Sequence, residues 1–314
     1  MDDSKESEIS ITSPSLSHPT RWWSKNTVAI VTGANKGIGF ALVKRLAKMG
    51  LSVILTARDL KRGSMAVEEL RSQGLLVYFF KLDVSDPASI FAFVAWFKDH
   101  FGALDILVNN AGVSFNEINE NTVEHAETVM KTNFYGAKLL TEAMLPMFRR
   151  CSQTTSRILN ITSRLGTLNK VRNSGVKEIL ESENVGEKEI EGVVRKFMED
   201  VKSGRWVSEG WPELWTDYAV SKLALNAYTR LLSKRYQGKG LSVNCFCPGF
   251  TQTSMTRGKG THSADDAALF AANLALLPPH HLPTGKFFLM PTTTTTSTAA
   301  AADHHHVLLN CSKL

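Results

Sequence analysis

The sequence has few cysteines, and they lack the spacing of a disulfide framework or a zinc site. The four are Cys151, Cys245, Cys247 and Cys311. Small secreted domains and zinc modules depend on closely spaced cysteine pairs, so the pattern argues against both classes. Cys245 and Cys247 alternate along an apolar stretch, as side chains in a strand do. We interpret the cysteines as reduced packing thiols in a reducing compartment, and we assign no metal site.

Long apolar runs are also missing. A membrane-spanning helix needs about 20 consecutive apolar residues, and no segment provides them. Residues 1–26 are polar, with acidic residues at positions 2, 3, 6 and 8, and they lack the apolar core of a signal peptide. Their acidity argues against an organellar transit peptide. We predict a disordered leader over residues 1–26, no membrane association and a cytoplasmic location.

A recognised nucleic-acid-binding motif is absent too, although the chain of 314 residues carries a net charge of +6. Excess positive charge suits a nucleic acid, and it equally suits a phosphorylated cofactor. Without a motif we favour the cofactor, and we predict no nucleic-acid partner. The length allows one large α/β domain or two small ones.

Short apolar runs alternate with segments of helical periodicity along most of the chain. This alternation predicts an α/β fold with a single doubly wound parallel sheet of the Rossmann type, with ligands beyond the carboxyl ends of the strands. Helices are expected over residues 40–49, 59–73, 87–100 and 122–150, the last ending early at Pro146. Ser263 and Asp266 form a capping box for a later helix. The expected strands are residues 27–32, 51–57, 75–82, 104–108, 157–161, 241–247 and 285–290.

A glycine-rich turn follows the first of these strands and opens a helix. Its glycines are Gly33, Gly37 and Gly39, and Asn35, Lys36 and Ile38 lie between them. Glycines allow a tight turn and a close approach of the backbone to a pyrophosphate, which then lies at the helix N-terminus. A purely structural turn is the alternative. The context of strand, turn and helix favours a dinucleotide cofactor.

The second strand lacks a carboxylate at its end, where an NAD site usually has one to bind the ribose 2′-hydroxyl. Arg58 follows the strand instead, and Lys36 lies in the glycine turn. Two cations favour a 2′-phosphate and hence NADPH. Asp59 is the discordant neighbour, and Arg58 as a solvated turn residue is the alternative.

Tyr218 and Lys222 lie four residues apart in a segment of helical periodicity, for which Thr216 is a plausible N-cap. Side chains four apart share one face of a helix. A phenol has a pKa of about 10, and a nearby ammonium lowers it. The pair can thus donate a proton in a reaction at a carbonyl or alcohol. Alone, the spacing also fits an ordinary surface pair.

Three further segments depart from the alternation. Residues 169–211 are rich in Glu and Lys and contain an amphipathic stretch at 188–201, which indicates an inserted helical segment before Tyr218. Residues 250–262 are polar and contain glycine, which suggests a mobile loop. Residues 291–314 consist largely of Thr and Ala runs and three adjacent histidines, so we predict a low-complexity tail after a domain over residues 27–290.

Five motifs in this order resemble the short-chain dehydrogenase/reductases over about residues 27–290. They are the glycine turn, Asn109-Asn110-Ala111-Gly112, Ser163, Tyr218-x3-Lys222 and Pro248-Gly249. The long gap between Ser163 and Tyr218, and Asn35-Lys36, resemble the carbonyl reductase branch. The sequence around Gly210-Trp211-Pro212 is similar to the plant menthone/neomenthol and salutaridine reductases.

The resemblance implies a role for each matching residue. Tyr218 would donate the proton to the carbonyl oxygen, Lys222 would lower its pKa and bind the nicotinamide ribose, and Ser163 would hydrogen-bond the substrate oxygen. Asn133 would hold a water that links Lys222 to solvent. The remaining cofactor contacts would be Asp83 and Val84 at the adenine, Asn110 along the site, and Thr251 at the carboxamide after Pro248 and Gly249.

We therefore expect an NADPH-dependent reductase of a small-molecule ketone or aldehyde. The alternatives are oxidation of a secondary alcohol with NADP+ at the same site, and a non-catalytic NADPH-binding interaction protein. In the carbonyl reductase branch the insertion covers the face through which many family members pair, which implies a monomer. Ser312-Lys313-Leu314 matches a peroxisomal address, so the peroxisome is the alternative location.

Overall fold

A computed structural model of the protein describes residues 7–12, 21–116, 120–149, 155–290 and 306–313. Its centre is one sheet, and in the described residues the strand order is β1-β9-β8-β7-β6-β5-β2-β3-β4. Seven strands, β2 to β8, are parallel, which confirms the predicted doubly wound sheet. The strands are β1 (Ser7–Thr12), β2 (Val28–Val31), β3 (Ser52–Ala57), β4 (Val77–Lys81), β5 (Ile106–Asn109), β6 (Ser156–Ile161), β7 (Leu241–Cys247), β8 (Lys286–Leu289) and β9 (His306–Lys313).

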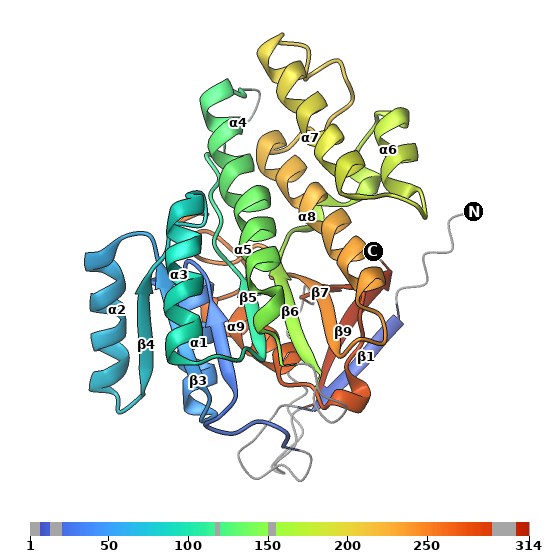
Figure 1. The fold of residues 1–314 in the computed structure, drawn as a ribbon. Coiled ribbons are helices and arrows are strands. Elements are labelled where there is room, and N and C mark those ends of the chain that lie inside the picture. Colours follow the sequence, from blue (N-terminus) through green and yellow to red (C-terminus); the bar gives the residue numbers. More distant parts are fainter. Residues whose placement is uncertain (1–6, 13–20, 117–119, 150–154, 291–305, 314) are drawn as a thin grey trace.

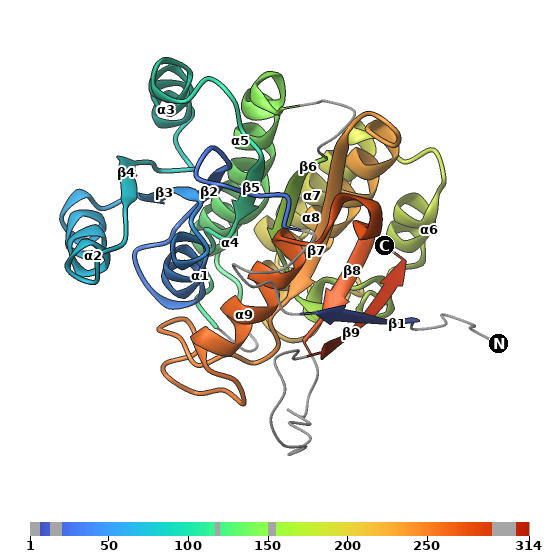
Figure 2. The same ribbon diagram turned by 90° about the horizontal axis from the view of Figure 1, so that it is seen from below.

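Helices cover both faces of the sheet (Figures 1 and 2). Buried apolar side chains of α1, α2 and α9 form the core on one face, and those of α3, α4, α5 and α8 form the core on the other. The helices are α1 (Gly37–Lys48), α2 (Leu60–Ser72), α3 (Pro87–His100), α4 (Val123–Met130), α5 (Ala137–Met144), α6 (Ser174–Glu181), α7 (Glu187–Lys202), α8 (Thr216–Arg235) and α9 (Ala264–Ala275). No helix in the described ranges is both long and apolar enough to cross a bilayer.

The helix expected over residues 122–150 is interrupted. A π-helical turn, Lys131–Gly136, joins α4 to α5, and a 3-10 turn, Leu145–Met147, ends the helix at Pro146 as predicted. A π-turn inserts an extra residue and rotates the side chains that follow it, and such turns are frequent at functional sites. This one carries Asn133.

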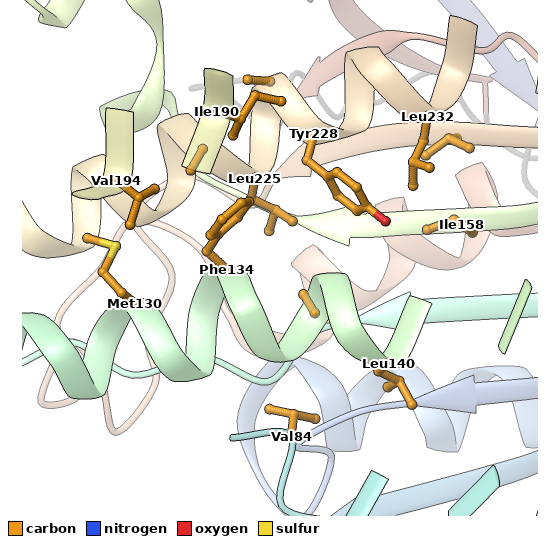
Figure 3. Close-up of a cluster of buried hydrophobic side chains, with 14 of the residues drawn as sticks. Val84, Met130, Phe134, Leu140, Ile158, Ile190, Val194, Leu225, Tyr228 and Leu232 are labelled. Carbon is orange, nitrogen blue, oxygen red and sulfur yellow. The ribbon is translucent and has the colours of Figure 1, made fainter. Parts of the chain in front are cut away.

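The predicted insertion forms two helices rather than one. The amphipathic stretch is α7, whose buried side chains recur at helical spacing, among them Ile190, Val194 and Phe197. Figure 3 shows Ile190 and Val194 beside Phe134 and Leu225, so α7 joins the main core on α4 and α8. Charged residues of α7 form ion pairs with neighbouring helices. Its Glu187, for example, pairs with Lys138 of α5 and Arg235 of α8.

The ends of the chain differ from the prediction. Within the expected disordered leader, Ser7–Thr12 forms β1, which pairs antiparallel with β9 at one edge of the sheet (Figure 1). Within the expected low-complexity tail, β9 pairs antiparallel with β8. Trp22 and Trp23 also anchor the end of the leader, because their indole nitrogens donate to Leu276 O and Met49 O. Residues 1–6, 13–20, 291–305 and 314 lie outside the described residues.

The insertion is anchored by a buried carboxylate, which gives a testable prediction. Asp200 is 2% exposed, and its Oδ2 accepts hydrogen bonds from Trp211 Nε1 at 2.9 Å and Lys196 Nζ at 3.0 Å. Asp200→Ala leaves the buried indole N–H without its acceptor, so we expect a loss of about 2–3 kcal/mol of unfolding free energy. For a domain of this size the melting temperature should fall by roughly 5–10 °C.

Thermal unfolding followed by circular dichroism measures this effect. Asp200→Asn is the matched control, since its amide oxygen still accepts from the indole, and it should lose less than half as much. An Ala variant that melts at the wild-type temperature would show that the carboxylate does not anchor the insertion.

Candidate active site

The strand order reverses between β2 and β5, and the segments that follow these two strands meet there. Parallel sheets bind ligands at such a reversal, beyond the carboxyl ends of the strands. Thr32 links the segments, because its hydroxyl accepts hydrogen bonds from Asn110 N and Ala111 N at 3.0 Å. Asn110 Nδ2 in turn donates to Thr32 O and Gly33 O. That Thr32 holds the two segments together was not predicted from the sequence, although its position directly before Gly33 could have indicated it.

Two glycines of the turn fit the close packing that a cofactor cradle needs. Gly33 has φ +61°, and a Cβ there would lie 2.8 Å from Ala111 Cα. A Cβ on Gly39 would lie 2.5 Å from Asn110 Nδ2 and 2.9 Å from Ala34 Cα. Neither position accepts a side chain without moving backbone, so the turn remains tight against β5.

The N-terminus of α1 has free donors for an anion. Its N-cap, Lys36, makes no side-chain hydrogen bond to the first turn, whereas Asp59 and Asp86 cap α2 and α3 with carboxylates. The first turn of α1 also contains no acidic residue. Unpaired backbone N–H groups and the helix dipole favour a phosphate at this end. The donor set therefore fits the pyrophosphate of a dinucleotide.

The structure explains the discordant Asp59. Its Oδ1 accepts a hydrogen bond from Arg62 N at 2.8 Å, and its Oδ2 forms an ion pair with Arg62 Nε at 3.1 Å. These contacts hold the pKa of the Asp59 carboxyl below its usual value. The carboxylate is thus occupied as the N-cap of α2. Arg58 and Lys36 are exposed, and within the described part of the chain neither has an ion-pair partner.

The predicted adenine contacts follow β4. Asp83 Oδ1 accepts hydrogen bonds from the backbone and the hydroxyl of Ser85, and Val84 is buried. A Cβ on Gly136 would lie 2.5 Å from Val84 O, so the π-turn packs directly on this segment. Residues 83 and 84 thereby lie beside the segment that carries Asn133.

The four predicted catalytic side chains come from three elements. Tyr218 and Lys222 lie one turn apart on α8, Ser163 follows β6, and Asn133 lies on the π-turn. The Ser163 hydroxyl lies near enough to the Tyr218 hydroxyl to oppose the rise of its pKa. Lys222 Nζ lies 5.5 Å from the centroid of the Tyr218 ring. The structure therefore brings the phenol, the serine hydroxyl and the ammonium into one site.

Asn133 is fixed by two partners. It is fully buried, and its side chain forms hydrogen bonds with both Val113 N and Val113 O. Its Nδ2 also donates to Ser221 Oγ at 3.0 Å, and Ser221 Oγ donates to Tyr218 O at 2.7 Å. Ser221 therefore joins the asparagine to α8. This residue was missed from the sequence, where only its place beside Lys222 marked it.

Gly112 lies between Asn133 and Lys222. A Cβ there would be 3.4 Å from Asn133 Oδ1 and 3.7 Å from Lys222 Nζ. The absence of a side chain leaves polar atoms of both residues facing the same space. This arrangement is compatible with the expected bridging water, which stays a prediction.

Burial shifts the two central pKa values. It raises the pKa of Tyr218 above its usual value, with the nearby Cys247 thiol adding to the rise and the Ser163 hydrogen bond opposing it. It lowers the pKa of Lys222 to about 8. We expected Lys222 to lower the pKa of Tyr218, and in the chain alone the shift has the opposite direction. The physical reason is that the phenol loses hydration, while Lys222 Nζ donates to Ile161 O at 2.8 Å.

The predicted cofactor-binding residues after β7 lie at the start of the loop formed by residues 250–262. Gly249 has φ +68°, and Thr251 is buried, with its hydroxyl donating to Pro248 O at 2.7 Å. Thr251 also forms an isolated bridge with His262, which closes residues 250–262 into a loop. The contact of Thr251 with a carboxamide remains a prediction.

The start of α8 corrects one expectation. Trp215, not Thr216, is the N-cap, and it makes no side-chain hydrogen bond to the helix. Thr216 is the first residue of α8 and is buried. Asp217 Oδ1 accepts from Tyr218 N at 2.6 Å, so a carboxylate of the first turn supplies the acceptor that we had assigned to Thr216.

Potential metal ligands do not gather in this region. In the ranges that the structure covers, no group of three or more His, Cys, Asp or Glu side chains has the geometry to hold an ion. Buried thiols of Cys245 and Cys247 lie on β7, and burial raises the pKa of each. Both side chains are thus neutral near pH 7 and contribute packing.

Comparison with known proteins agrees with this geometry. A family model described as short chain dehydrogenase matches residues 27–175 and 208–264. The chain is 39% identical over 286 residues to (+)-neomenthol dehydrogenase of Arabidopsis thaliana, which covers 83% of this chain and 95% of the relative. It is 38% identical over 274 residues to carbonyl reductase [NADPH] 1 of Mus musculus, and this alignment covers 84% of this chain and 96% of the relative. The solved structure of salutaridine reductase from Papaver somniferum superposes with a TM-score of 0.77 at 34% identity, covering 84% of this chain and all of that one.

Proposed function

The chain belongs to the short-chain dehydrogenase/reductase family and is an oxidoreductase, and we propose that it uses NADPH to reduce a ketone or aldehyde to an alcohol. The observation that carries the proposal is that Ser163 and Lys222 both lie beside the Tyr218 phenol. Burial keeps the phenol protonated near neutral pH. A protonated phenol next to a serine hydroxyl is the state that reduction requires, because the proton must be donated to the substrate oxygen.

Each residue has a distinct task in the proposed reaction. Ser163 and Tyr218 hold the carbonyl oxygen by hydrogen bonds and stabilise the negative charge that develops on it. NADPH, when bound, supplies the hydride. Tyr218 donates its proton to the oxygen, and the Lys222 ammonium favours the phenolate that is left. Asn133 and Lys222 then provide the path by which the phenol regains a proton.

The cofactor contacts belong to the same proposal. We assign the pyrophosphate to the uncapped N-terminus of α1 and the 2′-phosphate to Arg58 and Lys36. Asp83, Val84, Asn110 and Thr251 complete the expected contacts. The name of the carbonyl reductase [NADPH] relative supports this choice of cofactor.

The direction of the reaction separates reduction from the alternative, oxidation of an alcohol with NADP+. Oxidation needs a phenolate to accept the proton, and a raised pKa disfavours the phenolate near pH 7. The alternative therefore predicts significant turnover only at alkaline pH.

The pH dependence gives the corresponding prediction. Below about pH 8, Lys222 is charged and Tyr218 is protonated, so the reductive kcat should be high. As the pH rises through about 8, Lys222 loses its proton and the reductive kcat should fall, while the oxidative rate should rise with pH. Initial rates in both directions from about pH 6 to pH 10 measure this. A reductive kcat that rises through pH 8 would contradict the assignment of a protonated donor.

We also propose that the protein is a monomer, because α7 covers α4 and α8, the helices beside the catalytic residues.

A cytoplasmic location remains our prediction. For the peroxisomal alternative, Ser312 and Lys313 lie in β9, paired with Phe287 and Lys286, and Leu314 lies outside the described residues. Fusing residues 291–314 to a fluorescent reporter would distinguish punctate from diffuse signal.

A further inference from the structure

Strained backbone is concentrated around the candidate site. Among the described residues other than glycine, positive φ occurs at Asn116 (57°), Trp215 (49°) and Arg257 (53°). Asn116 lies in the segment after β5, Arg257 lies in the loop after β7, and Trp215 immediately precedes α8. Asparagine tolerates this conformation, but a tryptophan there is an outlier. Such strain persists only where the surroundings impose it, and it gathers at functional sites.

Helix capping does not explain the strain at Trp215. Its side chain makes no capping hydrogen bond, and its carbonyl, which accepts from Ala219 N at 2.7 Å, would be supplied by any residue. Glycine or asparagine would take this φ at lower cost. The indole itself must therefore be the reason that a tryptophan stands here.

The left-handed turn places the indole against the catalytic phenol. The rings of Trp215 and Tyr218 meet edge to face, with centroids 6.3 Å apart and planes at 79°. Both residues are half-buried. Lys222 Nζ lies 5.5 Å from the centroid of the same phenol ring. The indole is thus the aromatic neighbour that limits how the phenol ring can turn.

We propose that Trp215 is a positioning residue that fixes the Tyr218 ring so that its hydroxyl stays on Ser163 and is aimed at the substrate oxygen. This proposal rests on the proposed function, in which Tyr218 donates the proton. Misplacement of a reacting group by about 1 Å costs on the order of 100-fold in rate. A residue that restrains the phenol therefore acts on kcat rather than on cofactor binding.

Three substitutions in the full-length chain separate the ring from the backbone. Trp215→Ala and Trp215→Gly remove the indole, and each should lower kcat about 10- to 30-fold while the Kd for NADPH changes less than about twofold. Trp215→Phe keeps an aromatic edge and should retain kcat within about threefold. Trp215→Gly should melt at a higher temperature than Trp215→Ala, because glycine adopts φ +49° without strain.

The Gly variant prevents confusion with misfolding, because it should be more stable than the Ala variant while its kcat stays as low. A double substitution adds a second readout. If Trp215 acts through the phenol, Trp215→Ala should cost little further activity in a Tyr218→Phe background. Wild-type kcat in the Gly variant, equal losses in the Phe and Ala variants, or fully additive losses in the double variant would each overturn the proposal. Retained turnover in Tyr218→Phe alone would instead overturn the proposed function.

Discussion

Tyr218→Phe should lower kcat for carbonyl reduction about 1,000-fold, because proton donation by a positioned side chain contributes roughly 10²–10⁴-fold. The substitution removes the phenol hydroxyl that lies beside Ser163 and is kept protonated by burial. It keeps the ring, so the contacts with Trp215 and Lys222 remain. Steady-state NADPH oxidation measures the loss. Fluorescence titration should show NADPH binding within about twofold of wild type, since the hydroxyl contributes to chemistry more than to affinity.

Tyr228→Phe is the matched control for this prediction. Tyr228 lies on the same helix and is 1% exposed, and its hydroxyl donates to Glu142 Oε1 at 2.5 Å. Removing that hydroxyl should reduce stability by about 1 kcal/mol and leave kcat unchanged. If Tyr218→Phe turned over as fast as Tyr228→Phe, Tyr218 would not be the proton donor.

Arg58→Asp should lower the preference for NADPH over NADH, as a ratio of kcat/KM values, about 100-fold. A charge-assisted hydrogen bond contributes about 1.5–3 kcal/mol, and the new carboxylate repels a 2′-phosphate while it can accept from a 2′-hydroxyl. Arg58 is exposed at the end of β3, and in the described part of the chain it pairs with no carboxylate that would have to be released. The effect should lie mainly in KM, because the phosphate is remote from the reacting carbon.

Lys98→Asp provides the same change of net charge at a distance. Lys98 is exposed in the last turn of α3, which leads to the amino-terminal end of β5, whereas Arg58 follows the carboxyl end of β3. Its cofactor preference should equal that of the wild type. A preference that is unmoved in Arg58→Asp, or moved equally in both variants, would mean that Arg58 does not bind the phosphate.

The parallel sheet could be predicted from the sequence because its signal is local. Each of β2 to β8 is a short apolar run whose period and flanking residues suffice to identify it. The capping box of Ser263 and Asp266 was equally readable and is confirmed. The strands at the ends of the chain were not predictable, because β1 and β9 exist through pairing with each other and with β8. Such long-range pairing leaves little trace in local composition.

The candidate site likewise contains residues that local sequence predicts and contacts that it does not. The residue types of the predicted catalytic set follow from spacing and order, and the structure brings Tyr218, Ser163 and Lys222 together. The supporting contacts do not follow, because Ser221 and Thr32 acquire their roles from neighbours far along the chain, and Trp215 acquires its role from a left-handed backbone conformation. The direction of the Tyr218 pKa shift could not be predicted from the sequence either, because it depends on how deeply the phenol is buried.

The central claim is that this site transfers a hydride from NADPH to a carbonyl carbon. The most direct test incubates the full-length protein with NADPH that carries deuterium at both hydrogen positions of nicotinamide C4, and with a panel of terpenoid, alkaloid and simple aryl ketones. We predict that at least one ketone is consumed in step with NADPH, and that mass spectrometry finds one deuterium on the carbinol carbon of the product. NADPH binding without oxidation by any ketone, or an alcohol product without deuterium, would contradict the account and favour a non-catalytic NADPH-binding protein.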